Sequence, residues 1–250
     1  MHDLSRVLFV GSLTFATLAG QAGEVQVAVA ANFAVPLARL GEGFTSATGH
    51  TLKVSAGATG KFYSQIVAGA PFEVLIAADD ETPKRLVAEG HGIAGSNFSY
   101  AIGKLVLWSA QPGFVDDQGA VLASGKFLHV AIANPKVAPY GAAALEVLKA
   151  RGLRDAVTPR LVTAESIAQA YQFVSTGNAE LGFLALSQVA MPGKPITGSY
   201  WLVPPQLYGE IRQDAVLLKA GEKSAAARAL LQYLKSPPAK AVIASYGYGH

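Results

Sequence analysis

Short apolar runs alternate with amphipathic stretches along the first half of the chain. The apolar runs lie at residues 25–30, 52–55 and 74–78, and the amphipathic stretches lie at residues 34–47, 61–68 and 82–89. Runs of this length are typical of buried strands, and the stretches have the helical spacing of three to four positions. Each stretch is followed closely by a glycine, which commonly ends a helix. The alternation predicts an α/β domain with a largely parallel sheet.

The alternation continues in the second half. Predicted strands lie at residues 101–109, 130–133, 160–162, 181–186 and 211–218, and predicted helices at 142–151, 166–175, 224–234 and 238–245. The long strand at 101–109 and the strand around Gln213 bracket the middle unit, so we expect the chain to cross twice between two lobes. We assign residues 23–100 and 215–250 to lobe I and residues 101–214 to lobe II. The cleft between two such lobes is a favoured place for a ligand.

The first 22 residues have a different character. Arg6 precedes the apolar segment Val7–Ala19, and the small residues Gly20 and Ala22 follow it. This is the pattern of a secretory signal peptide. The apolar segment is shorter than the roughly 20 residues that span a bilayer. We therefore expect a signal peptide at residues 1–22 and a soluble mature protein that meets its ligand in the periplasm.

Composition excludes several kinds of chemistry. The 250 residues are 51% hydrophobic and 15% charged, and they include no cysteine. Disulfides, thiolate metal sites and cysteine nucleophiles are thereby excluded. The net charge of +3 is spread along the chain, so we expect no nucleic-acid partner. Four histidines stand apart from one another, which gives no metal-ligand spacing; they are His50, His91, His129 and His250.

Four loops stand where predicted strands lead into predicted helices. They are Ala30-Ala31-Asn32, Gly57-Ala58-Thr59-Gly60, Pro139-Tyr140-Gly141 and Glu165-Ser166-Ile167. In open α/β sheets ligands bind at such strand ends, and the free N–H groups at a helix start attract anions. Each loop alone fits an ordinary helix cap or turn. Their equivalent positions in two lobes that face one cleft favour a shared anion site.

Known catalytic and nucleotide motifs do not fit these loops. The segment Gly57–Lys61 is similar to the end of a P-loop, but Ser55 stands where a glycine is required and Phe62 where Ser or Thr must follow the lysine. A secreted hydrolase that uses Tyr140 or a serine is an alternative from another class. No arrangement of Ser, His and Asp supports it.

Several blocks in this order resemble the periplasmic molybdate-binding proteins that serve ABC importers. The blocks are Val27–Phe33, Ser55–Gly60, Gln65–Pro71, Ala77–Asp79, Asn134–Pro135, Ala138–Gly141, Ala164–Ile167 and Glu180–Phe183. The match extends over essentially the whole mature chain, to Tyr246-Gly247-Tyr248. The resemblance is specific because several blocks occur in the same order. No single block would be enough to indicate the family.

The resemblance implies a fold and a function. The fold is that of a two-lobed, type II periplasmic solute-binding protein, in which each lobe is a mixed sheet flanked by helices and the ligand lies between the lobes. The function is capture of molybdate or tungstate for an inner-membrane ABC permease with its ATPase. The resemblance implies no enzymatic activity and no cofactor, and it implies molybdenum or tungsten bound only as the oxyanion, without direct metal ligands. We expect a monomer.

The resemblance also assigns the oxyanion ligands. They fall on Ala31, Asn32, Ala58, Thr59, Tyr140 and Ile167, the last two acting through backbone N–H groups. The commonest family pattern has Ser at positions 32 and 59, a small residue at 140 and Tyr at 185. This chain has Asn, Thr, Tyr and Ala there, and so resembles a variant branch with Asn in the first loop and Tyr in the third.

Chemistry independently favours a fully deprotonated tetrahedral dianion. Such an ion presents only acceptors, so its site should consist of donors. Phosphate carries a proton at neutral pH and calls for an acidic acceptor, but the first three loops contain no Asp or Glu. Glu165 in the fourth loop is the exception. A receptor for another oxyanion, such as sulfate or chromate, is the nearest alternative.

The signal peptide gives the first testable prediction. Exported protein from a Gram-negative host should begin at or near Gly23, because the junction Ala22-Gly23 follows a small-x-small pattern. Mass spectrometry of the exported protein measures the mature N-terminus. An intact Met1 on exported protein would contradict the prediction.

Overall fold

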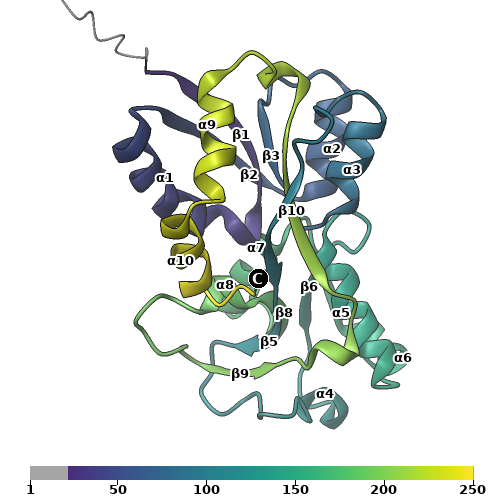
Figure 1. Cartoon of the computed structure of the whole chain (residues 1–250). Helices are drawn as coiled ribbons and strands as arrows, with labels where there is room; N and C mark the ends of the chain where they lie inside the picture. Colours follow the sequence, from purple (N-terminus) through teal and green to yellow (C-terminus); the bar gives the residue numbers. More distant parts are fainter. Residues whose placement is uncertain (1–21, 250) are drawn as a thin grey trace, which may run out of the picture.

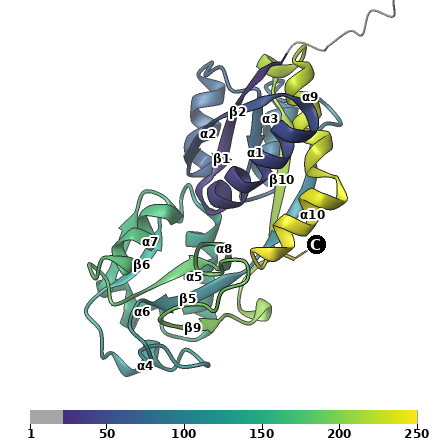
Figure 2. The same cartoon turned by 90° about the vertical axis from the view of Figure 1, so that its left-hand side faces the viewer.

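Two five-stranded sheets organise the chain, one in each of two lobes (Figure 1). The computed structural model describes residues 22–249, so the predicted signal peptide lies outside the described residues except for Ala22. Figure 2 shows the two lobes one above the other. Among residues 22–249, no helix has both the length and the apolar composition needed to cross a bilayer.

The sheet of the first lobe combines both ends of the described chain. Its strands, in order across the sheet, are β2 (Thr51–Gly57), β1 (Glu24–Ala30), β3 (Val74–Ile76), β10 (Ile211–Leu217) and β4 (Phe98–Gly103). β1 pairs in parallel with β2 and β3, whereas β10 is antiparallel to β3 and β4. The C-terminal strand therefore completes a sheet that the N-terminal strands begin.

Helices cover both faces of this sheet (Figure 1). They are η1 (Ala31–Phe33), α1 (Ala34–Thr48), α2 (Thr59–Val67), α3 (Glu81–Ala88), η4 (Lys219–Gly221), α9 (Ala225–Leu234) and α10 (Pro237–Ser245). Because side chains alternate along a strand, Val27 and Val29 of β1 pack with α1, α9 and α10, while Ala28 packs with α2 and α3. Burial on both faces explains why β1 is apolar without interruption from Val27 to Ala30.

The second lobe repeats the plan of the first. Its sheet has the order β7 (Leu161–Ala164), β6 (Val130–Ala133), β8 (Leu181–Ala185), β5 (Leu105–Ser109) and β9 (Ser199–Leu202). β6 is parallel to β7 and β8, and β5 is antiparallel to β8 and β9. The helical segments are α4 (Val121–Ser124), α5 (Pro139–Ala150), α6 (Arg154–Val157), η2 (Thr158–Arg160), α7 (Ile167–Ser175), α8 (Leu186–Val189) and η3 (Pro205–Leu207).

The strand predicted at residues 101–109 is wrong as a single element. β4 belongs to the first sheet and β5 to the second, and Lys104 lies between them. Gly103 and the exposed Lys104 stand between the two apolar parts of the run, but hydrophobicity alone does not tell which sheet each part joins. The chain returns to the first lobe between β9 and β10. The lobe limits at 100/101 and 214/215 stay predictions, and they fall within β4 and β10.

Helix starts lie at the carboxyl ends of parallel strands in both lobes. α5 follows β6, and its first turn is packed against the end of that strand. At Gly141 in this turn, a Cβ atom would overlap the carbonyl oxygen of Ala133. Glycine is therefore required for α5 to begin beside β6, which fixes where Tyr140 lies.

Gly141→Ala should destabilise the protein, because the overlapping atom belongs to the backbone and cannot rotate away. Overpacking of this kind costs about 1–3 kcal/mol. The melting temperature of a chain of this length should fall by about 2–4 °C for each kcal/mol. Gly209→Ala is the matched control, since the nearest atom to its Cβ would be Glu146 Oε2 at 3.6 Å. Equal melting temperatures for both variants would contradict the prediction.

Candidate functional site

All six residues that the sequence predicted as ligands line one small cavity between the lobes. The complete lining is Ala30, Ala31, Asn32, Gly57, Ala58, Thr59, Ala78, Ala138, Pro139, Tyr140 and Ile167. The first seven come from the first lobe and the last four from the second. The space open to the centre of a water molecule is about 10 Å³. Sites for organic ligands typically measure about 300–1,000 Å³, so this cavity suits one compact ion.

Helix starts supply the N–H groups around the cavity. Thr59 is the first residue of α2, Tyr140 the second of α5 and Ile167 the first of α7. N–H groups in the first turn of a helix have no partner within the helix, and they lie at the positive end of its dipole. In α2, Gly60 N–H already donates to Val137 O, and Lys61 and Phe62 N–H donate to Ala58 O. The Thr59 N–H is left available to the cavity.

The Thr59 hydroxyl accepts one hydrogen bond and keeps its own proton unused. Its Oγ1 accepts a hydrogen bond from Ala78 N–H at 3.0 Å, and the side chain is buried. Accepting this bond orients the oxygen and leaves the hydroxyl proton free to donate. Thr59 can therefore offer a donor to an anion from a fixed position.

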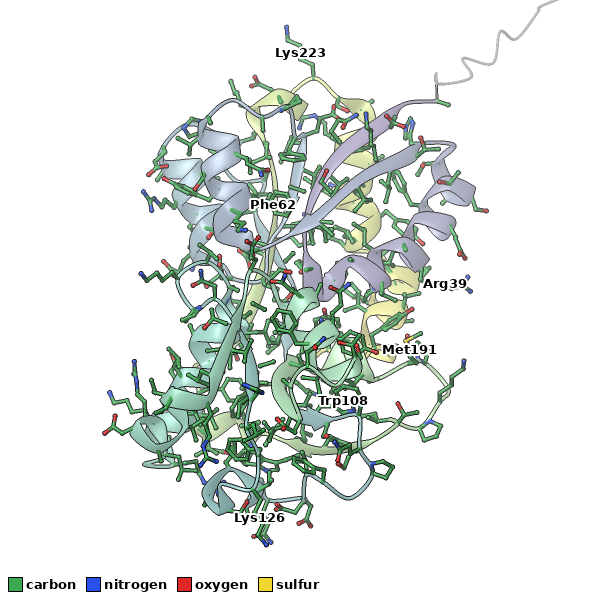
Figure 3. All side chains as sticks on the ribbon, turned by 180° about the vertical axis from the view of Figure 1, so that it is seen from behind. Arg39, Phe62, Trp108, Lys126, Met191 and Lys223 are labelled. Carbon is green, nitrogen blue, oxygen red and sulfur yellow. The ribbon has the colours of Figure 1, made fainter. Side chains whose placement is uncertain are left out.

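No charged side chain among residues 22–249 lines the cavity. Glu165 lies outside it and forms an ion pair with Lys61 across the two lobes, with Nζ and Oε2 2.6 Å apart. Hydrogen bonding to Lys61 lowers the pKa of Glu165 below its usual range. Figure 3 shows the labelled cations Arg39, Lys126 and Lys223 at the edges of the molecule. The groups that could hold an anion in the cavity are therefore neutral ones, including the N–H groups at the helix starts.

Asp79 follows the lining residue Ala78, and its carboxylate accepts hydrogen bonds from the start of helix α3. Its Oδ1 accepts from Thr82 N–H at 2.8 Å, and its Oδ2 accepts from the Thr82 hydroxyl at 3.2 Å. Burial raises the pKa of Asp79. Its carboxylate is directed at α3 and not at the cavity.

A buried polar network lies behind the cavity and joins the lobes. Asn32 Nδ2 donates to Gln213 Oε1 and to the Tyr248 hydroxyl, both at 2.9 Å. Gln213 Nε2 donates to the Tyr140 hydroxyl at 2.9 Å, and the Tyr100 hydroxyl lies 2.9 Å from Gln213 Oε1. Asn32 Oδ1 is buried and has no partner among the described residues. The Asn32 side chain, predicted to donate to the anion, thus has its amide donor turned to this network.

Comparison with known proteins identifies the family. The family model for bacterial extracellular solute-binding proteins matches residues 25–249. The chain belongs to this family. It is 58% identical over 247 residues to the molybdate-binding protein ModA of Azotobacter vinelandii, covering 99% of this chain and 98% of that protein. It is 52% identical over 253 residues to ModA of Rhodobacter capsulatus, covering 99% of both chains.

A solved structure supports the same relationship. The Azotobacter vinelandii periplasmic molybdate-binding protein matches with a TM-score of 0.89 and 43% identity, covering 90% of this chain and 99% of that chain. The type II, two-lobed architecture predicted from the sequence is confirmed. Membership of the solute-binding family also confirms that the protein is not an enzyme, so the hydrolase alternative is not supported.

Sequence reasoning missed the network of this solute-binding protein. Gln213, Tyr100 and Tyr248 come from distant parts of the chain, and no motif assigned any of them a role at the site. One signal was present: in the strand Ile211–Leu217, the polar residues Gln213 and Asp214 follow the exposed Arg212 and are themselves buried. Two adjacent polar residues in a buried strand indicate that at least one has a buried partner.

The three network tyrosines provide a test in solution. Burial raises the pKa of Tyr100, Tyr140 and Tyr248 above that of an exposed tyrosine, which is about 10. Since the pKa is higher in the folded state, these groups stabilise the fold below pH ~10, and this contribution is lost as the pH rises towards the folded-state values. The melting temperature should fall above pH ~10.

Ultraviolet absorbance of phenolate measures the ionisation directly. The three buried tyrosines should ionise only as circular dichroism shows unfolding. Ionisation of all nine tyrosines in a single step, with the fold intact, would show that the network is open to solvent.

Proposed function

We propose that this protein captures molybdate, and also tungstate, in the periplasm and delivers it to an inner-membrane ABC permease with its ATPase. The observation that carries the proposal is the convergence of Ala31, Asn32, Ala58, Thr59, Tyr140 and Ile167 on one small cavity. The two relatives named molybdate-binding protein ModA, at 58% and 52% identity over nearly the whole chain, support the ligand assignment.

The donor set suits a dianion without protons. Thr59 offers a hydroxyl proton as well as an N–H group, and Tyr140 and Ile167 offer N–H groups at helix starts. Hydrogen bonds from such donors to an ionised acceptor are stronger than neutral ones. Phosphate at neutral pH would need an acceptor for its proton, and the two carboxylates closest in sequence to the lining residues, those of Glu165 and Asp79, are turned elsewhere. The site therefore favours molybdate and tungstate over phosphate.

The two-lobed arrangement suits capture and release. Besides the buried network, the lobes contact each other through the hydrogen bond from Gly60 N–H to Val137 O and through the exposed pair of Lys61 and Glu165. Exposed ion pairs contribute only about 0–1 kcal/mol, so separation of the lobes is not prevented by them. An anion bound to donors of both lobes adds the stabilisation that keeps them together. We propose that the protein acts as a monomer and presents the closed form to the permease.

Thermal shifts with different anions test the ligand. A ligand at 100 times its dissociation constant adds about 2.7 kcal/mol, which for this length corresponds to about 5–10 °C. We expect this shift with molybdate and tungstate at micromolar excess, and almost none with sulfate or phosphate at the same concentration. Sulfate is smaller, so it leaves donors stretched, each at a cost of about 1–3 kcal/mol. Equal shifts with sulfate and molybdate would contradict the assignment.

Variants of Thr59 test the site. Thr59→Val keeps the shape but removes the donor, so molybdate affinity in calorimetric titration should fall by about 10- to 150-fold, as expected for loss of a hydrogen bond to a charged group. Thr59→Ser is the matched control, because it keeps the hydroxyl and should stay close to the wild-type affinity. If Val and Ser bind equally well, the Thr59 hydroxyl serves only Ala78 at the helix start.

A further inference from the structure

The starting point is the partnerless oxygen of Asn32. This side chain is 2% exposed and lines the cavity, and its Nδ2 is engaged by Gln213 and Tyr248. The remaining amide position, occupied by Oδ1, has no partner. A buried acceptor without a donor destabilises the fold, and next to an anion it would also repel the ligand.

Exchanging the two amide positions of Asn32 would turn its NH₂ group away from the network and free it to donate to the anion. This exchange cannot occur alone. Asn32 Oδ1 would then face Gln213 Oε1 at the present 2.9 Å, and two acceptors would oppose each other. The Gln213 amide must therefore exchange at the same time. An amide occupies nearly the same space in both orientations, so the double exchange needs no further movement.

The doubly exchanged arrangement pairs every group. Gln213 Nε2 donates to Asn32 Oδ1 and to the Tyr100 hydroxyl, which itself donates to Ala77 O at 2.9 Å. Gln213 Oε1 accepts from the Tyr140 hydroxyl. The Tyr248 hydroxyl, which now donates to the Asn32 carbonyl oxygen, donates to Asn32 Oδ1 instead, and that carbonyl keeps the hydrogen bond from the Ser187 hydroxyl at 2.9 Å. Asn32 Nδ2 is then the donor left for the cavity. Fully satisfied buried networks of this kind favour a single arrangement.

We propose that Gln213 is a positioning residue that orients the Asn32 amide towards the bound oxyanion and couples it to Tyr140 in the second lobe. The inference rests on the proposed function. Gln213 is fully buried, and the β4–β10 pairing shifts register between Gln213 and Asp214, passing over Tyr100. Such irregularities re-aim side chains. Binding at Asn32 and contact between the lobes are thus linked through one side chain.

A double-mutant cycle in calorimetric titrations with sodium molybdate tests the coupling. Gln213→Met keeps the length of the side chain but neither donates nor accepts as an amide does, so affinity should fall about tenfold or more. In the Asn32→Ala background, the same change should have less than about a twofold effect, because its target is gone. Asp214→Asn is the matched control: Asp214 is its buried neighbour and bonds Ser99, not Asn32, so affinity should be unchanged.

Nuclear magnetic resonance of the molybdate-bound wild-type protein reports the amide orientations directly. A purely structural role of Gln213 would not produce the signals expected here. The Gln213 NH₂ protons should show Overhauser effects to the Tyr100 side chain and not to Tyr140, and the Asn32 NH₂ signals should shift when molybdate is added. This measurement holds even if Gln213→Met fails to fold.

The outcomes separate the inference from the proposed function. Wild-type affinity in Gln213→Met, an equal loss in both backgrounds, or Gln213 NH₂ contacts to Tyr140 would each overturn the inference while leaving molybdate binding intact. Absence of molybdate binding by the wild-type protein would overturn the proposed function itself.

Discussion

Two carboxamides and three tyrosines are buried between the lobes and must satisfy one another's hydrogen bonds. Asn32, Gln213, Tyr100, Tyr140 and Tyr248 are each at most 5% exposed. An amide can satisfy its partners in only one of two orientations, so each group restricts the next. The orientation of the Gln213 amide therefore sets the orientation of Asn32 at the cavity and the hydrogen bond with Tyr140 in the second lobe.

The arrangement of the chain makes this contact possible. Each sheet has parallel strands at one edge and antiparallel strands at the other, and the chain passes from the first sheet to the second at Lys104. Gly103 ends β4 at this junction, where a Cβ atom would overlap the Tyr140 hydroxyl. The crossing strands thus provide both the connection between the lobes and the space in which the network lies.

The contacts between the lobes differ in how strictly they depend on geometry. The pair of Lys61 and Glu165 is exposed, so salt screens it. Gly60 allows close approach, since a Cβ atom there would lie 3.0 Å from Val137 Cα. The buried network and the helix starts around the cavity depend instead on exact hydrogen-bond geometry. In the proposed function, the exposed contacts alone do not hold the lobes together, and the hydrogen bonds from both lobes to the anion stabilise the closed form.

The sequence by itself determined the alternation of strands and helices, the two-lobed class and the loops that come together. These features follow from local periodicity and from blocks such as Ser55–Gly60, which are written in consecutive residues. Tertiary structure alone decided that β4 and β5 lie in different sheets, that Glu165 turns to Lys61, and that Asn32 depends on Gln213, which lies 181 residues away. The physical reason is that burial looks the same in one sheet as in another, and that a side chain's hydrogen-bond partner is set by proximity in space, which hydrophobic spacing does not encode.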